Sequence, residues 1–266
     1  MTTREGPARA DDVDEGERRA SGPARSIERA LDILRVLRDS RVPLRLTDIA
    51  RESGNHLATT QRILNVLVRS SYAHQNLNGY TIGVTSLLNS YSFLLSNSLV
   101  QVSLPVLQEL SHVSGFFASL AVRVEMNAIL LVRLEGISQL GYQLPVGEPM
   151  PLYLGGARVL AAYMEPEEIK ELLNTVPEIR LGSGEIVTHE EFIENLRVIR
   201  EQGYVIGRSQ RILGAASAAV PVHDREGKVV ASLQLSRTDV DLTSDKMDWC
   251  VGELKRASVA IERRLG

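Results

Sequence analysis

The chain has 266 residues, 44% of them hydrophobic, which allows one large domain or two smaller ones and excludes disorder throughout. Its net charge of −3 argues weakly against a protein that coats nucleic acid with its whole surface. A single cysteine, Cys250, excludes an internal disulfide and a cysteine-rich zinc site, and no apolar run approaches the roughly 18 residues that span a bilayer.

We therefore expect a cytoplasmic protein with no membrane segment, metal or cofactor, in which Cys250 is a packed side chain. The charge is unevenly distributed along the chain. Residues 26–98 hold eight arginines against five acidic residues, whereas residues 99–266 hold 17 basic against 22 acidic residues. A modestly basic segment joined to an acidic one indicates two tasks on one chain.

The first 84 residues contain a polar tail and the pattern of a small helical domain. Residues 1–25 carry charge, glycine and proline but almost no large apolar side chains, so we expect them to be disordered. Helical spacing begins at Ser26, the expected N-cap. After Pro43 a second helix is predicted, with Thr47 as a possible cap and Gly54 as a left-handed terminator.

A third helix is predicted from Leu57 to about Ser70, and a hairpin follows it. The alternation of polar and apolar residues around Asn78-Gly79 is a strong hairpin signal. Three helices and a two-stranded wing in some 60 residues indicate a winged helix-turn-helix, which we assign to residues 26–84.

The third helix presents a face suited to DNA. With Leu64 pointing inward, Leu57, Thr60, Leu67 and Val68 share its side, while Ala58, Thr59, Arg62, Asn65 and Arg69 point away. Small side chains allow close approach to a base pair, arginine can bind guanine and asparagine can bind adenine. The candidate DNA-binding residues are Thr47, Ala58, Thr59, Gln61, Arg62 and Asn65. An ordinary solvated helix face is the alternative.

From Val84 to about Gln108 the pattern is again helical, with a nearly continuous apolar stripe made of Leu87, Leu88, Tyr91, Leu95, Leu99 and Val102. One exposed helix does not need so much apolar surface. We predict a linker helix over residues 85–103 that packs against a second copy of itself. Burial within one chain is the alternative.

Residues 104–266 alternate between strand-like and helical patterns. Two strands are expected on either side of Glu125–Asn127, and another pair on either side of Asp224–Gly227. Helices include one that opens on Pro166, one with a capping box of Thr188 and Glu191, and a closing amphipathic helix. The fold class is α+β, with an antiparallel sheet in a sensor-like domain.

An ordered series of motifs resembles the IclR family of bacterial transcriptional regulators. It runs through "SIERALDIL", "LTDIARESGNHLATTQRILNVLVRSSYA", "YTIGVTSLL", "VRLEG", "GEPMPLYLGGARVLAAYM", "EQGYVIG" and "GAASAAVPVHDREGKVVASLQLS", over roughly residues 26–240. The resemblance implies a winged helix, a linker helix and a GAF-like effector-binding domain. It also implies homodimers, often paired into dimers of dimers, that bind palindromic operators in double-stranded DNA, and it favours repression.

The resemblance also implies where an effector would bind, and this sequence departs from the family there. The loop Tyr153–Arg158 is one residue shorter than is frequent in the family, Ser217 stands for a frequent cysteine, and Gln234 replaces a serine. The implied effector-binding residues are Phe117, Tyr142, Tyr153, Gly155, Gly156, Ala157, Ser217, Gln234 and Ser236.

These residues also have simpler explanations. Gly155 and Gly156 expose backbone amides that suit a carboxylate or carbonyl oxygen, although the pair could be only a turn. Ser217 could be a small core residue, and Tyr153 could serve packing alone. We expect a small aromatic or organic acid as effector, or a derivative such as an amide or ester.

The function predicted from the sequence is a ligand-responsive DNA-binding repressor of a catabolic operon. The alternatives are a sensor or scaffold that does not bind DNA, and an enzyme built on the C-terminal domain. No serine lies in a Gly-x-Ser-x-Gly motif, and the five histidines show no metal-ligand spacing. We therefore expect no catalytic residues and no metal site.

Overall fold

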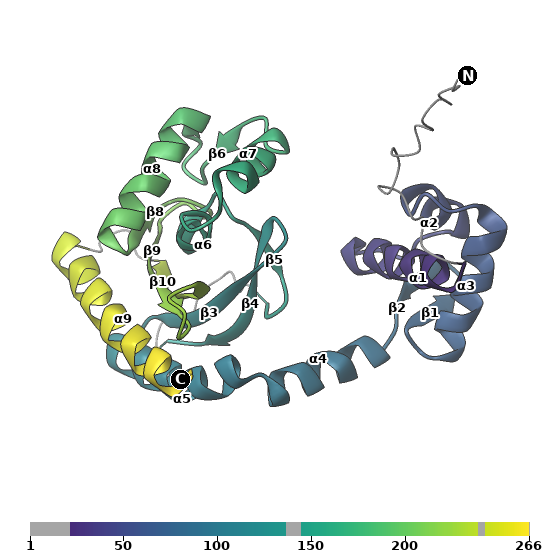
Figure 1. Cartoon of the computed structure of the whole chain (residues 1–266), viewed down its shortest axis with the longest axis horizontal. Helices are drawn as coiled ribbons and strands as arrows, with labels where there is room; N and C mark the ends of the chain where they lie inside the picture. The colour runs from purple at the N-terminus through teal and green to yellow at the C-terminus, as the bar shows by residue number, and fades with distance from the viewer. Residues whose placement is uncertain (1–21, 137–144, 239–242, 266) are drawn as a thin grey trace, which may run out of the picture. The chain divides into compact units, whose positions relative to one another are not determined.

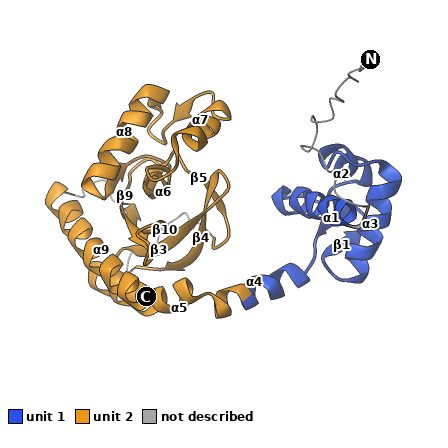
Figure 2. Cartoon of the chain, in the orientation of Figure 1, with its two compact units in different colours: residues 1–92 blue, residues 93–266 orange. Residues whose placement is uncertain are grey.

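The computed structural model describes residues 22–136, 145–238 and 243–265. Its contacts divide the chain into two compact units, residues 1–92 and 93–266 (Figure 2). The first unit has the expected winged-helix elements: α1 (Gly22–Asp39), α2 (Leu46–Glu52), α3 (Leu57–Arg69), β1 (Ala73–Asn76) and β2 (Gly79–Ile82). They enclose a small core of Ile33, Leu37, Ile49, Leu64, Leu67, Ala73 and Tyr80.

Two expectations about helix starts are wrong. Helix α1 begins at Gly22, so Ser26 lies inside it and residues 22–25 do not belong to a disordered tail. Proline fits the first turn of a helix because the N–H it lacks has no partner there, which is why Pro23 does not delay the start. The N-cap of α2 is Arg45, without a side-chain cap, and Thr47 lies within the first turn. Residues 1–21 lie outside the described ranges.

The predicted hairpin is present, but its turn lies one residue earlier than expected. Asn76 pairs with Gly79, so the turn residues are Leu77 and Asn78. Gly79 has a φ of +136°, and a Cβ there would lie 2.7 Å from the carbonyl carbon of Leu44. Leu44 forms a bridge with Tyr80, so this glycine lets the segment before α2 pair with the wing.

Replacing Gly79 by alanine is expected to destabilise the N-terminal unit by about 2–4 kcal/mol, because backbone strain and a backbone collision combine. Gly54→Ala is the matched control: Gly54 also has a positive φ, +66°, but a Cβ there would meet nothing within 4 Å. It should cost about 1 kcal/mol. Urea unfolding of both variants measures the difference, and equal losses would contradict the packing explanation.

The apolar segment that follows is two helices, α4 (Thr85–Ser96) and α5 (Ser98–Ser114), not one. Asn97 interrupts them, because its side chain accepts a hydrogen bond from the Val100 N–H and caps α5. The predicted stripe divides at the same place. Leu99 and Val102 pack against the core of the second unit, whereas Leu87, Leu88, Tyr91 and Leu95 are exposed.

The second unit is built on a six-stranded antiparallel sheet with the strand order β5-β4-β3-β10-β9-β8. The predicted strand pairs around Glu125–Asn127 and Asp224–Gly227 are both present. The strands are β3 (Phe117–Val124), β4 (Asn127–Leu134), β5 (Pro149–Pro151), β8 (Val205–Arg208), β9 (Ala215–His223) and β10 (Val229–Thr238). A short separate hairpin is formed by β6 (Ile179–Arg180) and β7 (Ile186–Val187).

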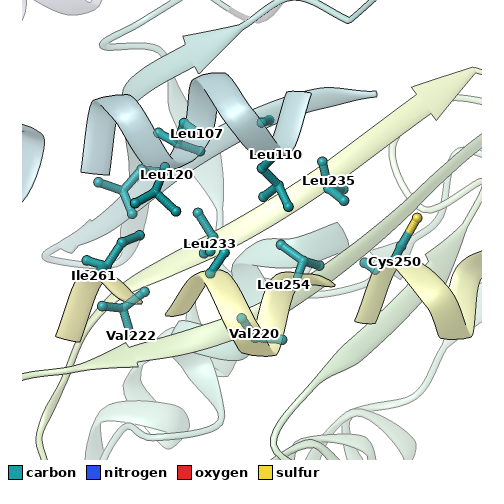
Figure 3. Packing of buried hydrophobic residues seen from close by; sticks show 14 of the residues in the cluster. Leu107, Leu110, Leu120, Val220, Val222, Leu233, Leu235, Cys250, Leu254 and Ile261 are labelled. Atoms are coloured by element: carbon teal, nitrogen blue, oxygen red, sulfur yellow. The ribbon is translucent and has the colours of Figure 1, made fainter. Parts of the chain in front are cut away.

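Helices cover both faces of this sheet (Figure 1). Helix α5 and the closing helix α9 (Ser244–Leu265) pack on one face through leucine, valine and isoleucine side chains, including Leu107, Leu235 and Leu254 (Figure 3). The other face carries a 3₁₀ turn, η1 (Gly155–Ala157), and the helices α6 (Arg158–Ala161), α7 (Pro166–Asn174) and α8 (His189–Gln202). Helix α8 has the predicted Thr188–Glu191 capping box.

Cys250 is fully buried between α9 and the sheet, as predicted (Figure 3). Burial raises the pKa of its thiol to about 11, and so the thiolate is scarce at neutral pH. The side chain therefore acts as a small apolar group. Within the described ranges, no helix is long and apolar enough to cross a membrane.

Candidate DNA interface and effector pocket

The turn between α2 and α3 is held by local hydrogen bonds. The Ser53 N–H donates to the Ile49 oxygen over 2.9 Å, and the Asn55 N–H donates to the Ala50 oxygen over 3.0 Å. Gly54 adopts the left-handed conformation that was predicted, with a φ of +66°. Helix α3 thus leaves α2 through a short and well-defined turn, as in a helix-turn-helix.

Helix α3 has one buried and one exposed face, close to the predicted division. Thr60, Leu64 and Leu67 are buried. Leu57 was expected on the buried side but is 49% exposed, because the first residue of the helix extends beyond the small core. The candidate DNA-binding side chains of this helix are exposed or half-buried: Ala58, Thr59, Gln61, Arg62 and Asn65. Thr47, on α2, is also exposed.

Gln61 connects α3 to the two-stranded wing. Its side-chain amide donates hydrogen bonds to Asn65 Oδ1, at 2.9 Å, and to the Tyr80 hydroxyl on β2, at 3.3 Å. Asn65 is thereby oriented, while its oxygen keeps one lone pair and its NH₂ group keeps two donors for a base edge. Gln61 therefore positions Asn65.

The two arginines of α3 differ from Arg51 of α2 in their surroundings. Arg51 of α2 lies within 3.5 Å of Asp48 and within 3.3 Å of Glu52. In the described part of the chain, by contrast, no acidic side chain pairs with Arg62 or Arg69, and α3 contains no aspartate or glutamate. An exposed cationic helix face with small neighbours suits the negative major groove of DNA.

In the second unit, the glycine turn η1 is fastened to the sheet. Ser232 on β10 donates a hydrogen bond to the Gly156 oxygen over 3.1 Å. Gly155 has a φ of +58°, and a Cβ on Gly156 would collide with the Gln234 side chain and lie 3.0 Å from the Ala219 Cβ. The glycine pair is therefore required both by the turn and by its close approach to β9 and β10.

A cavity of about 90 Å³ lies between this turn and the sheet. Its walls come from η1, from β8 and the segment after it, and from strands β4, β5, β9 and β10. The lining residues are Arg133, Met150, Leu154, Gly155, Gly156, Ala157, Gly207, Gln210, Arg211, Ile212, Ala215, Ala216, Ser217, Gln234, Ser236, Arg237 and Thr238.

The structure brings together most of the predicted effector-binding residues. Those that line the cavity are Gly155, Gly156, Ala157, Ser217, Gln234 and Ser236. Phe117 does not, because the Arg133 guanidinium covers its ring at 4.5 Å from the centroid. Tyr153 packs against the hydrophobic core formed with α6 to α8. Tyr142 lies outside the described residues.

Strand register explains why these distant residues meet. Ser236 on β10 is opposite Ser217 on β9, and Ser217 is opposite Gly207 on β8. One row of facing residues therefore crosses three strands at the cavity. Facing positions of antiparallel strands share a face of the sheet, so all three lie on the side that carries η1.

Sequence reasoning missed the arginines of the pocket. Arg133, Arg211 and Arg237 line the cavity, and the described lining contains no carboxylate. The alternation in β4 could have placed Arg133 on one sheet face, but an arginine in a half-buried strand is ordinarily solvated. Arg211 lies in an irregular segment whose course the sequence pattern does not predict.

Arg158, the first residue of α6, is a buried cation beside the pocket, with 7% of its surface exposed. Its Nε donates to the Gly155 oxygen over 3.2 Å and its Nη1 donates to Asn195 Oδ1 over 2.8 Å. Burial lowers its pKa to about 10, so the group remains protonated at neutral pH.

Comparisons with known proteins agree with this architecture. The family described as the IclR helix-turn-helix domain matches residues 26–77, and the family described as bacterial transcriptional regulator IclR C-terminal matches residues 92–263. The HTH-type transcriptional repressor AllR of Salmonella typhimurium is 27% identical over 245 residues, which are 91% of this chain and 90% of AllR. The regulator XynR of Escherichia coli is 26% identical, over 91% of this chain and 97% of XynR.

Solved structures show the same fold. An IclR homolog from Microbacterium hydrocarbonoxydans, crystallised with 4-hydroxybenzoate, has a TM-score of 0.72 and 23% identity, covering 90% of this chain and 98% of its own. The winged helix and the sheet domain with its pocket define a DNA-binding transcriptional regulator with an effector-binding C-terminal domain. The two matched domains together span most of the chain, which belongs to the IclR family.

Proposed function

We propose that this regulator is a repressor of a catabolic operon, and that a small aromatic or organic acid, or a derivative of one, changes its affinity for operator DNA. The observation that carries the proposal is the cavity beneath η1, which is lined by arginines and polar side chains and lies in the unit that does not contain the helix-turn-helix. The protein acts by binding and not by catalysis, in the cytoplasm, where its DNA target lies.

The DNA-bound form in this proposal is a homodimer on a palindromic operator, with dimers paired into a dimer of dimers as a further step. The exposed apolar side chains of α4 support self-association: Leu87, Leu88 and Tyr91 are each at least 59% exposed. Contiguous apolar surface of this kind marks an interface more often than a solvated helix. The functional division into residues 26–84, 85–103 and 104–266 stays a prediction.

The class of effector is supported by the charge and size of the pocket. A carboxylate would suit a lining that contains three arginines and no described acidic residue, and Ser217, Gln234 and Ser236 supply further polar contacts. The complex of the Microbacterium homolog with 4-hydroxybenzoate supports an aromatic acid as one possibility. The volume of the cavity, about 90 Å³, favours a small molecule.

The response to ligand would be a population shift. A ligand that binds one conformation of the C-terminal unit better than another favours that conformation, and the linker helices then change the spacing of the two recognition helices. Helix α4 spans the boundary between the two compact units, because residues 85–92 belong to the first unit and residues 93–96 to the second. This position supports the proposed route.

Saturating ligand is expected to change amide hydrogen exchange in residues 85–105, since this segment would transmit the shift. Mass spectrometry of the full-length protein with and without ligand measures the effect, with β3 and β10 in the sheet core as the internal reference. Unchanged exchange over residues 85–105, with operator affinity altered by the same ligand, would contradict the linker mechanism.

Two experiments test the proposed function directly. A thermal-shift screen of small carboxylic acids and their amides identifies the ligand class. Gel retardation of the chain's own promoter region at low salt, with and without the compounds found, then tests regulation. The proposal requires retardation that a stabilising compound weakens, and DNA binding that no stabilising compound alters would contradict it.

A further inference from the structure

The guanidinium of Arg158 has one nitrogen without a hydrogen-bond partner in the described structure. Its Nη2 is buried and has no hydrogen-bond partner in the described structure, although Nε and Nη1 are both engaged. A Cβ built on Gly207 would lie 3.3 Å from this nitrogen and 3.3 Å from Ser217 Oγ. Gly207 and Ser217 both line the cavity, whereas Arg158 is not among its lining residues, so the buried donor lies behind the part of the wall that these two residues form.

No counter-charge for Arg158 is present in the described residues. Burial alone accounts for the lowered pKa of the guanidinium, and its two hydrogen-bond partners are a carbonyl and an amide oxygen, which are neutral. A buried charge without a partner is costly, and a buried donor without an acceptor adds to that cost. A protein keeps such a group where something else supplies the missing partner.

We propose that Arg158 binds the anionic group of the effector, which enters beside Gly207 and accepts a hydrogen bond from Nη2. This inference rests on the proposed effector pocket and narrows its ligand to the acid itself. A neutral amide or ester could accept the same hydrogen bond but would leave the buried positive charge uncompensated. The smallest molecule with the required chemistry is a carboxylate such as acetate.

The missing side chain of Gly207 supports the same assignment. An added Cβ would lie 3.3 Å from both Nη2 and Ser217 Oγ but only 2.8 Å from Gln210 Cγ, so the flexible side chain of Gln210 closes this approach and must move when an anion reaches Nη2. Arg133 and Arg237, which also line the cavity, are placed over the rings of Phe117 and Phe116, at 4.5 and 5.6 Å from the centroids. Arg158 differs because its guanidinium is held by hydrogen bonds to neutral oxygens and, among the described contacts, lies over no aromatic ring.

The test compares acetate with acetamide, a neutral molecule of similar shape, in thermal unfolding of the full-length protein. Sodium chloride balances the ionic strength of the acetamide samples. Acetate at about ten times its Kd is expected to raise the Tm of the native chain by about 2–4 °C, and acetamide is expected to leave it unchanged. Arg158→Met, which keeps length and removes charge, should abolish this difference.

Two further variants complete the test. Arg225→Met is the matched control, since Arg225 is exposed at the β9–β10 turn, and it should keep the full acetate effect. Gly207→Ala retains Arg158 but places a methyl group beside Nη2, so it should also lose the stabilisation by acetate. This variant tests the proposal even if Arg158→Met does not fold. A native chain that does not distinguish acetate from acetamide, or a difference that persists in Gly207→Ala, would overturn the proposal.

Operator binding by the native chain, measured in parallel, separates this inference from the proposed function. An Arg158-dependent acetate effect in a protein whose operator affinity no acid changes would leave the anion site intact and reject regulation. Operator binding that responds to an acid, together with an acetate effect that does not depend on Arg158 or Gly207, would reject the inference alone.

Discussion

Arg62→Ala is expected to weaken operator binding by about 1–3 kcal/mol and to relax base preference at one position of each half-site. The reason is geometric. Arg62 is exposed on α3, beside the small side chain of Ala58, and it has no acidic partner among the described residues. A guanidinium so placed can form two parallel hydrogen bonds with a guanine. Fluorescence anisotropy with an operator fragment and single-base variants measures both effects.

Arg69→Ala is the matched control, because Arg69 is an exposed arginine in the last turn of the same helix. A residue there would contact phosphate at most, so its loss should weaken all sequences alike and reduce the salt dependence of binding. The prediction for Arg62 is wrong if its alanine variant also weakens every sequence uniformly. Arg62 would then be a phosphate contact.

Ser217→Leu is expected to abolish the response to effector and to leave operator affinity in the absence of ligand within about twofold. Ser217 is opposite Ser236 and Gly207 in the sheet, and all three line a cavity of only about 90 Å³. A branched apolar side chain would fill that space and remove a hydroxyl, whereas the helix-turn-helix belongs to the other compact unit. Ligand titrations of the operator complex measure the loss.

Ser217→Ala separates the loss of the hydroxyl from the filling of the cavity, since it removes the hydroxyl and leaves the cavity open. We expect a response that needs about tenfold more ligand, which corresponds to the loss of roughly one hydrogen bond. An unaltered response midpoint in Ser217→Leu would mean that the effector binds elsewhere. A collapse of DNA binding in Ser217→Leu would show a folding defect, which circular dichroism would also detect.

The DNA-binding unit was largely predictable because its signals are local. Gly54 stands where a left-handed residue ends α2, and the inward spacing of Thr60, Leu64 and Leu67 defines one face of α3. The errors occurred where local rules compete. Gly79 was interpreted as a turn residue, but glycine is needed there because the Leu44 backbone lies too close for any side chain.

The pocket could be predicted only in part. The family resemblance brought Gly155, Gly156, Ser217 and Gln234 to one place, and the structure does the same. It did not indicate that the Arg133 guanidinium covers Phe117, or that Arg158 is buried with no counter-charge among the described residues. Burial and partners of a long cationic side chain depend on neighbours far away in the chain, so periodicity carries no information about them.

The sequence by itself determined the two-part organisation, most of the elements and the outward face of α3, because each depends on side-chain periodicity and on glycine and proline at defined positions. Only the tertiary structure decided how the apolar stripe divides at Asn97 and which side chains surround the cavity. Both depend on strand register and helix packing, which join residues far apart in the chain, such as Arg158 and Gly207, which are 49 positions apart.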